Sequence, residues 1–237
     1  ERELMEFESK LFFEVLVSSA FVKGAAISLS LATLSQFFAI IIGFFLALFR
    51  LGKNKILKNF ASTYIWFFRA IPALLLLLIV WNAFPQLIPA LRQEWYSPFL
   101  AAMIALSILE AAYMAEILRS SIMSVDEGQS LAARALGMTP FQVMRKILIP
   151  QLTRIAIPPT ANEYIGMIKY TSLASVISLQ ELLTRAGNGV SATFRYVEYY
   201  LGALIYYLVI VSILMFLQAK LEKKYAWVST KRNGIRA

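Results

Sequence analysis

The chain has 237 residues, of which 59% are hydrophobic and 16% are charged, and its formal net charge is +9. It contains no cysteine and no histidine, which leaves no disulfide and little material for a metal site or a Ser-His-Asp arrangement. The composition therefore weighs against an enzyme and indicates a chain whose solvent is largely lipid.

Residues 1–21 begin with charged, mostly acidic residues and continue with an apolar face that includes Leu11, Phe12 and Val15. We expect an external helix that lies at the membrane surface or against a neighbouring element. The segment lacks the basic-then-apolar order of a signal peptide. Because the first residue is not methionine, we also expect the numbering to begin inside a longer chain.

Five segments are apolar enough to be interpreted as membrane-spanning helices, since about 20 such residues cross a bilayer. The first, second and fifth contain no charged residue, whereas the third is interrupted by Glu110 and the fourth contains Glu163 and Lys169. The fourth is expected to begin after Pro158 and Pro159, which suit a first helical turn. The predicted spans are residues 24–49, 70–91, 97–119, 158–179 and 199–219, and the second is expected to begin on the inner side around residues 61–66.

Lysine and arginine are distributed unevenly between the segments that flank these spans. One side holds 15 of them, in residues 50–58, 119–154 and 220–237. The other side holds 6, in residues 1–23, 85–97 and 180–198, which include a predicted outer loop at 184–194. The positive-inside rule then predicts an external N-terminus and a basic cytoplasmic tail at residues 226–237. The positive charge is explained by topology, and no nucleic acid partner is needed.

Residues 120–151 form a polar, alanine-rich insert between the third and fourth spans, on the predicted cytoplasmic side. Ser124 or Asp126 can cap a first helix, Gly137 suits a left-handed turn, and Thr139 followed by proline suits the start of a second helix. We expect this second helix to end at the next proline. The pattern predicts a helix-turn-helix, which on its own also fits an amphipathic hairpin on the membrane surface.

The spacing within this insert resembles the cytoplasmic loop of the permease subunits of ATP-binding-cassette (ABC) importers. In that family the loop carries the EAA motif: Glu-Ala-Ala, three residues, Gly, nine residues, Ile, one residue, Leu-Pro. This chain has LAA at 131–133, Gly137, and ILIP at 147–150, with the same spacing. Leu131 replaces the acidic residue of the motif, and Ile149 replaces its last leucine.

Three further blocks resemble the branch of this family that imports polar amino acids. They are FFRAIP at 67–72, AYMAEILRSSI at 112–122 and ANEYIGMIKYTSLASVISLQEL at 161–182. The resemblance implies an all-α integral membrane protein with the type I importer permease fold and about five transmembrane helices. It implies a permease domain over residues 22–225 that includes the cytoplasmic coupling insert.

In that family the permease performs no chemistry, and a pair of separate ATPase subunits hydrolyses ATP. The resemblance therefore implies no cofactor or metal on this chain, and ATP with magnesium on the ATPase partners. It also implies a second permease subunit, identical or related, an external amino-acid-binding protein, and a bacterial inner membrane. Gly52 and Lys53 form the single Gly-Lys pair, and they lack the glycine pattern of a Walker A loop.

The resemblance gives the insert the role of a rigid lever docked in a groove of the ATPase. The small side chains of Ala132 and Ala133 would permit close approach to the ATPase, while Gly137 and Thr139 would shape the turn between the helices. These four residues are the predicted coupling residues.

Ionisable residues inside the spans need partners or water, because a central charge costs about 2.5 to 3.5 kcal/mol on insertion scales. Glu110 is followed one turn later by Tyr113, and Glu163 by Met167, at overlapping predicted depths. We predict that these four residues line a central amino-acid site. Two carboxylates in such a site would favour substrates with a cationic side chain.

Other charges near the spans have local interpretations. Arg69, at the head of the second span, is expected to reach back to the inner interface. Glu116 and Arg119 are three residues apart and are predicted to form a local ion pair.

Alternatives to the transport site remain at this point. In one, Glu110 or Glu163 pairs with Lys169 or Arg69 and holds helices together. An autonomous channel or ion-coupled carrier would use the same intramembrane charges without any ATPase, and a purely structural subunit would not use them in transport. Under both functional alternatives, the match between the spacing of the insert and the EAA motif would be a coincidence.

Overall fold

The computed structural model describes residues 7–225, and every regular element in this range is helical. Four short helical segments differ in pitch from the α-helices. Ile79–Ala83 and Met144–Leu148 are π-helices, and Pro89–Arg92 and Thr171–Ile177 are 3-10 helices. The α-helices are α1 (Ser9–Val17), α2 (Ser19–Leu51), α3 (Lys55–Ala70), α4 (Ala73–Leu78), α5 (Phe84–Leu87), α6 (Pro98–Met123), α7 (Glu127–Ala135), α8 (Pro140–Val143), α9 (Ile149–Tyr170), α10 (Leu182–Thr193) and α11 (Tyr196–Tyr225).

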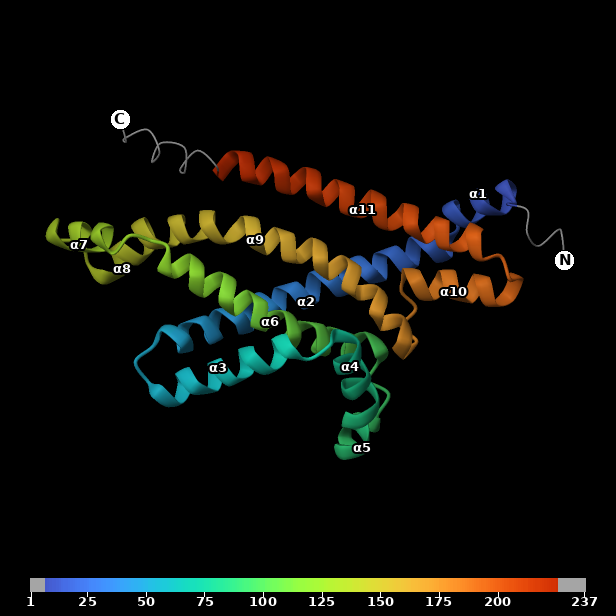
Figure 1. Ribbon diagram of the computed structural model, residues 1–237, viewed down its shortest axis with the longest axis horizontal. Coiled ribbons are helices and arrows are strands. Elements are labelled where there is room, and N and C mark those ends of the chain that lie inside the picture. The colour runs from blue at the N-terminus through green and yellow to red at the C-terminus, as the bar shows by residue number, and fades with distance from the viewer. Residues whose placement is uncertain (1–6, 226–237) are drawn as a thin grey trace.

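The long helices run along a common direction (Figure 1). Among the described helices, α2, α6 and α11 are long and apolar enough to cross a membrane, and α3 with the segment through α5 makes a fourth if this bent pair is one span. α9 carries three charged residues and does not meet the same criteria, although it packs against α6 and α11. The α2–α3 connection, α7, α8 and the end of α11 lie at one end of the bundle, and α1 and α10 at the other (Figure 1).

The structure has no straight second span that begins around residues 61–66 and continues over residues 70–91. α3 ends at Ala70, and the chain bends by 103° before the next helical segment, which begins at Ala73. Ile71 is extended, with φ −80° and ψ 134°, because proline disfavours the helical conformation in the residue before it. Arg69 lies one residue before the end of α3, about 21 Å along the axis from its first residue.

The prolines that were expected to delimit the fourth span lie elsewhere in their helix. α9 begins at Ile149, so that Pro158 and Pro159 fall in its interior. The predicted helix end at Pro150 is also wrong, since the π-helix Met144–Leu148 leads from α8 directly into α9. Pro150 is the second residue of α9, which directly follows the π-helix, so its missing N–H falls where the helical hydrogen bonding is already irregular.

The predicted N-terminal helix is divided between α1 and the start of α2. Ser18 is extended, and its hydroxyl caps α2 by accepting a hydrogen bond from the N–H of Phe21. α1 packs against α11, where the N–H of Glu8 donates to the carboxylate of Glu198 over 2.8 Å. Residues 1–6 of the predicted helix and the predicted tail at 226–237 lie outside the described residues.

Residues 184–194, predicted as an outer loop, form most of α10. Glu181 caps this helix by accepting hydrogen bonds from two backbone N–H groups of its first turn, over 2.9 and 2.7 Å. The same carboxylate, which is fully buried, accepts hydrogen bonds from Ser28 of α2 and Tyr207 of α11. Burial raises the pKa of the Glu181 carboxyl above its ordinary value, while these hydrogen bonds act in the opposite direction. Glu181 thus joins α10 to two long helices.

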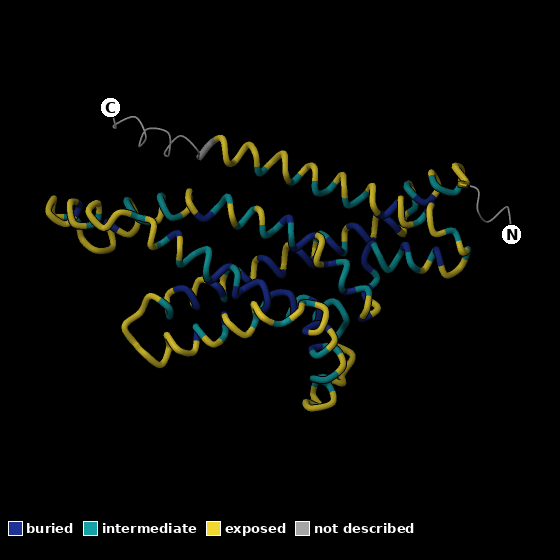
Figure 2. Tube along the Cα trace, viewed as in Figure 1, coloured by how far each residue is buried: buried dark blue, intermediate teal, exposed yellow. Residues whose placement is uncertain are grey.

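α2 and α6 pack closely because small residues line their contact. Ala39, Ala47, Ala111 and Ala115 are fully buried, and Gly43 lies directly against α6. Small residues allow two helix backbones to approach each other in a membrane protein. Figure 2 shows that buried residues lie in the middle of the bundle, whereas both ends and much of α11 are exposed.

Candidate functional site

α6 carries three polar residues spaced by three, Glu110, Tyr113 and Glu116. Each lies about 60° round the helix from the one before, so over about 9 Å they pass from the side of α6 near α9 toward the side near α2. α9 packs beside α6 and brings Glu163 near Glu110. The structure thus brings together the two carboxylates that the sequence placed at similar depths.

Glu110 is 1% exposed, and neither of its carboxylate oxygens has a hydrogen-bond partner within the described residues. Glu163 is half-buried and close enough for the two carboxylates to repel each other. A buried carboxylate without partners is costly, most of all in a lipid environment. This pair therefore calls for a cation, a proton or water.

The other two predicted site residues differ in exposure. Tyr113 is half-buried, and the guanidinium carbon of Arg69 lies 5.5 Å from the centroid of its ring, a cation-π contact. Met167 is fully buried in the main core cluster. The exposed Tyr170, one turn after Met167 on α9, lies within electrostatic reach of both carboxylates and of Tyr113.

The alternative ion pairs with Lys169 or Arg69 are not formed within residues 7–225. Neither Glu110 nor Glu163 takes part in an ion pair there. Lys169 is exposed on another side of α9, and Arg69 lies over an aromatic ring. No side chain in the described part of the protein neutralises the two carboxylates.

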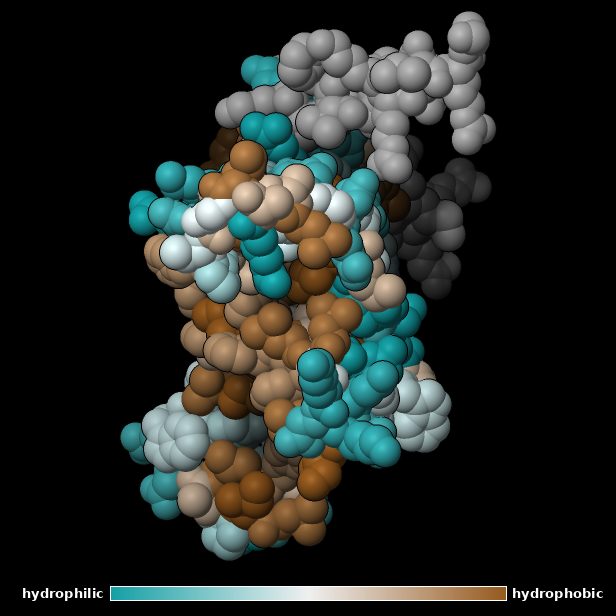
Figure 3. All heavy atoms as spheres, turned by 90° about the vertical axis from the view of Figure 1, so that its left-hand side faces the viewer, coloured by the Kyte–Doolittle hydropathy of each residue, from teal (hydrophilic) through white to brown (hydrophobic). Residues whose placement is uncertain are grey.

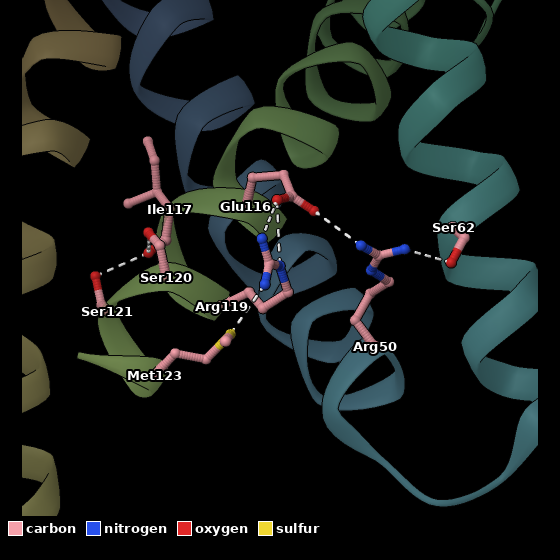
Figure 4. Close-up of polar contacts among 8 residues, drawn as sticks. All are labelled: Arg50, Ser62, Glu116, Ile117, Arg119, Ser120, Ser121 and Met123. Atoms are coloured by element: carbon pink, nitrogen blue, oxygen red, sulfur yellow. Dashed lines mark hydrogen bonds and ion pairs between the residues drawn. The ribbon is translucent and has the colours of Figure 1, made fainter. Parts of the chain in front are cut away.

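Glu116 is the centre of an ionic cluster between α2, α3 and α6 (Figure 4). Arg119 donates two hydrogen bonds to one carboxylate oxygen, over 2.7 and 3.2 Å, which confirms the predicted local ion pair. Arg50 of α2 approaches the other oxygen at 3.9 Å and also donates a hydrogen bond to Ser62 of α3. Arg50 could not be assigned to this cluster from the sequence, because no local spacing connects it to α6.

The insert has the predicted helix-turn-helix form. Asp126 caps α7 by accepting a hydrogen bond from the N–H of Gly128 over 2.8 Å. Gly137 follows the helix with a φ of +80°, and its N–H and that of the next residue donate to carbonyls three and five residues earlier, which is a Schellman motif. Thr139 and Gln142 then form a capping box at the start of α8.

The two faces of the insert differ in character. Ala133 and Val143 are buried between α7 and the segment that follows it. Ala132, Leu131 and Phe141 are exposed, so that of the two predicted contact alanines Ala132 lies on the surface. Figure 3 views this end of the molecule and shows an apolar area bordered by hydrophilic residues.

Long apolar helices with ionisable groups between them, and a capped two-helix insert at one end, define an integral membrane protein of the transport-subunit class. Within residues 7–225, no group of three or more Asp or Glu residues is arranged to hold a metal ion. Residues 39–227 match the family described as "binding-protein-dependent transport system inner membrane component". The chain belongs to this family, whose members are membrane permease subunits.

Individual relatives agree with this assignment. The chain is 38% identical over 213 residues to the "Probable amino-acid permease protein YxeN" of Bacillus subtilis (strain 168), covering 89% of this chain and 94% of that protein. It is 39% identical over 214 residues to the arginine transport system permease protein ArgU of Corynebacterium glutamicum, covering 86% of this chain and 67% of that protein.

A solved structure has the same fold. A chain in the crystal structure of an amino acid ABC transporter with histidines matches with a TM-score of 0.78 and 35% identity, covering 86% of this chain and 94% of that chain. The predicted all-α fold of an ABC importer permease is therefore confirmed.

Proposed function

We propose that this chain forms, together with a second permease subunit, the membrane pathway of an ATP-driven amino-acid importer that prefers basic side chains. The observation that carries the proposal is the pair Glu110 and Glu163. One carboxylate is buried without a hydrogen-bond partner in the described residues, and the second lies close to it. A cationic end group would supply both the missing charge and the missing hydrogen-bond donors.

The relatives support an amino acid as the substrate. One is named as an amino-acid permease, another as an arginine transport permease, and the matching crystal structure is of an amino acid transporter with histidines. Membership of the family does not by itself show which amino-acid side chains are transported. The preference for a basic substrate therefore depends on the two carboxylates.

Tyr113 and Met167 have different roles in this site. Tyr113 is half-buried beside the carboxylates and forms an aromatic wall that a substrate cation can contact. Met167 is fully buried, and it supports the site from the core side.

The insert is the proposed joint to an ATPase subunit, which binds ATP and magnesium. Leu131 and Ala132 lie on the exposed face of α7, available to an ATPase groove. Ala133 keeps α7 close to the segment after it, and Gly137 and Thr139 hold the angle between the helices. The cap hydrogen bonds support this lever role, because force is transmitted only if the turn is stiff.

The proposed orientation has the N-terminus outside and the C-terminus in the cytoplasm. The insert, the α2–α3 connection and the end of α11 lie together at one end of the bundle (Figure 1). Residues 50–58, 119–154 and 220–225, in and beside these segments, carry 12 of the 23 lysines and arginines. In this orientation α1 and α10 face the external binding protein that delivers the substrate. Residues 1–21 form an external segment, and residues 22–225 form the permease domain.

Uptake by the complete transporter tests the substrate preference. Glu110→Gln and Glu163→Gln should each reduce the uptake of labelled arginine by about tenfold relative to that of glutamine, because a charge-assisted contact is lost. Glu94→Gln, in an exposed loop, is the matched control and should change neither rate. An unchanged ratio in both site variants would show that the carboxylates do not select the substrate.

Affinity purification tests the assembly. The tagged chain, taken from its native membrane, should carry an ATPase subunit, and Gly137→Arg should abolish this association because it disrupts the turn. If the parent chain carries no ATPase and still transports without ATP, the autonomous carrier becomes the better explanation.

A further inference from the structure

A cavity of about 510 Å³ has Tyr113 of α6 in its wall. Its walls come from α2, α3 and α6, and the residues that matter here are Arg50, Ser62, Arg69, Tyr113 and Glu116. Tyr113 therefore belongs both to the predicted substrate site and to this cavity.

The cavity is surrounded by an excess of positive charge. Three arginines lie around a single carboxylate, that of Glu116, which is already held by Arg119 at 2.7 Å and by Arg50 at 3.9 Å. Arg69 lies within electrostatic reach of Glu116 but forms no ion pair with any residue in the range 7–225. Its guanidinium is exposed and held over the Tyr113 ring. A guanidinium in this state can bind a carboxylate through two parallel hydrogen bonds.

The negative and positive sites are close enough to bind one molecule. Tyr113 lies one turn after Glu110 on α6, about 4.5 Å along the axis, and the guanidinium carbon of Arg69 lies 5.5 Å from the centroid of the Tyr113 ring. A basic amino acid is a dipolar molecule, with a cation at the end of its side chain and a carboxylate at the other end. Opposite charges attract strongly where water is scarce.

We infer that Arg69 binds the α-carboxylate of the transported amino acid while Glu110 and Glu163 hold its cationic side chain, with the Tyr113 ring between the two ends. This inference rests on the proposed function and adds the orientation of the substrate and its class. The site selects α-amino acids with a free carboxylate and rejects amines of the same side chain that lack one. Arg50 and Arg119 neutralise Glu116, so that this carboxylate does not repel the substrate.

Binding of arginine and agmatine to the purified complex tests this orientation. Agmatine has the guanidinium of arginine but no carboxylate. The complex of the permease with its ATPase is held in lipid nanodiscs without the external binding protein, which would itself select the carboxylate. The parent should bind labelled arginine about tenfold more tightly than agmatine, the effect of one charge-assisted contact.

Variants distinguish the contribution of Arg69 from that of the two carboxylates. Arg69→Gln should weaken arginine binding by about tenfold and leave agmatine binding unchanged, which also shows that the variant is folded. Arg69→Lys should retain part of the preference, Glu110→Gln should weaken both probes, and the exposed Arg154→Gln should change neither.

Three results would overturn the inference. Equal affinity of the parent for the two probes would exclude a carboxylate subsite. Equal weakening of both probes by Arg69→Gln would mean that the arginine only supports Tyr113. Binding of neither probe by the folded parent complex would contradict the proposed function itself, and the inference would fail with it.

Discussion

A side chain at Gly43 of α2 would place its Cβ 2.6 Å from the Cβ of Met114 on α6. The backbone of the next residue on α6, Ala115, would lie 2.9 Å from the same atom. Both contacts are too short for real atoms and involve the backbone or the base of a side chain, so neither can be relieved by a rotamer change. Glycine at position 43 therefore sets the distance between the two helices.

Gly43→Val should lower the melting temperature of the purified permease clearly, because the helices must separate and the alanines between them lose contacts. Gly166→Ala in α9 is the matched control, since no atom lies within 4 Å of a Cβ built there. Alanine at that position should be neutral or stabilise the helix by up to about 1 kcal/mol. Equal melting temperatures for the valine variant and the parent would show that this contact adapts.

Gly137→Ala should impair coupling to the ATPase more than it impairs folding. The φ of +80° at this position is unfavourable for alanine, by about 1 to 2 kcal/mol, and the turn it forms is exposed at the tip of the molecule. ATP hydrolysis stimulated by substrate should fall, with little change in the melting temperature of the bundle. Gly187→Ala, within α10 and with no atom near its Cβ, should leave the hydrolysis rate unchanged.

Glu181 should make the stability of the permease depend on pH. Burial raises the pKa of its carboxyl above the ordinary value of about 4.3, so the folded protein keeps a proton that the unfolded chain has lost. The stability that this proton contributes is complete below the ordinary pKa and is lost as the pH rises through the folded pKa.

The melting temperature of the parent should therefore fall more than that of Glu181→Gln as the pH is raised above the ordinary carboxyl pKa of about 4.3. The exposed Glu94→Gln should follow the parent over the same range. Parallel curves for the parent and Glu181→Gln would show that the hydrogen bonds to the carboxylate fully offset its burial.

The contact between Arg50 and Glu116 should contribute modestly to stability. Both side chains are about one quarter exposed, 28% and 24%, and pairs of this kind contribute up to about 1 kcal/mol. In a double-mutant cycle, Arg50→Gln and Glu116→Gln should each destabilise, and the double variant should lose less than the two together. Strict additivity would show that Arg119 alone satisfies the Glu116 carboxylate.

The sequence by itself determined the features that depend on neighbours in the chain. Apolar length predicts the long helices α2, α6 and α11, because each must satisfy its own backbone in lipid. The caps at Asp126, Gly137 and Thr139 form between residues at most five positions apart, so the shape of the insert could be predicted from its spacing. The pairing of Glu116 with Arg119 is equally local.

Only the tertiary structure decided the features that join distant segments. A local preference, that of Ile71 before proline, explains why α3 ends there, but the 103° angle of the bend depends on packing, and α9 continues through Pro158 and Pro159 against local preference. The approach of Arg50 to Glu116 joins helices far apart in the sequence. A side chain on one helix contacts a side chain on another only when the rotation of both helices about their axes and their positions along the bundle are fixed. Packing of small residues, such as those between α2 and α6, fixes both.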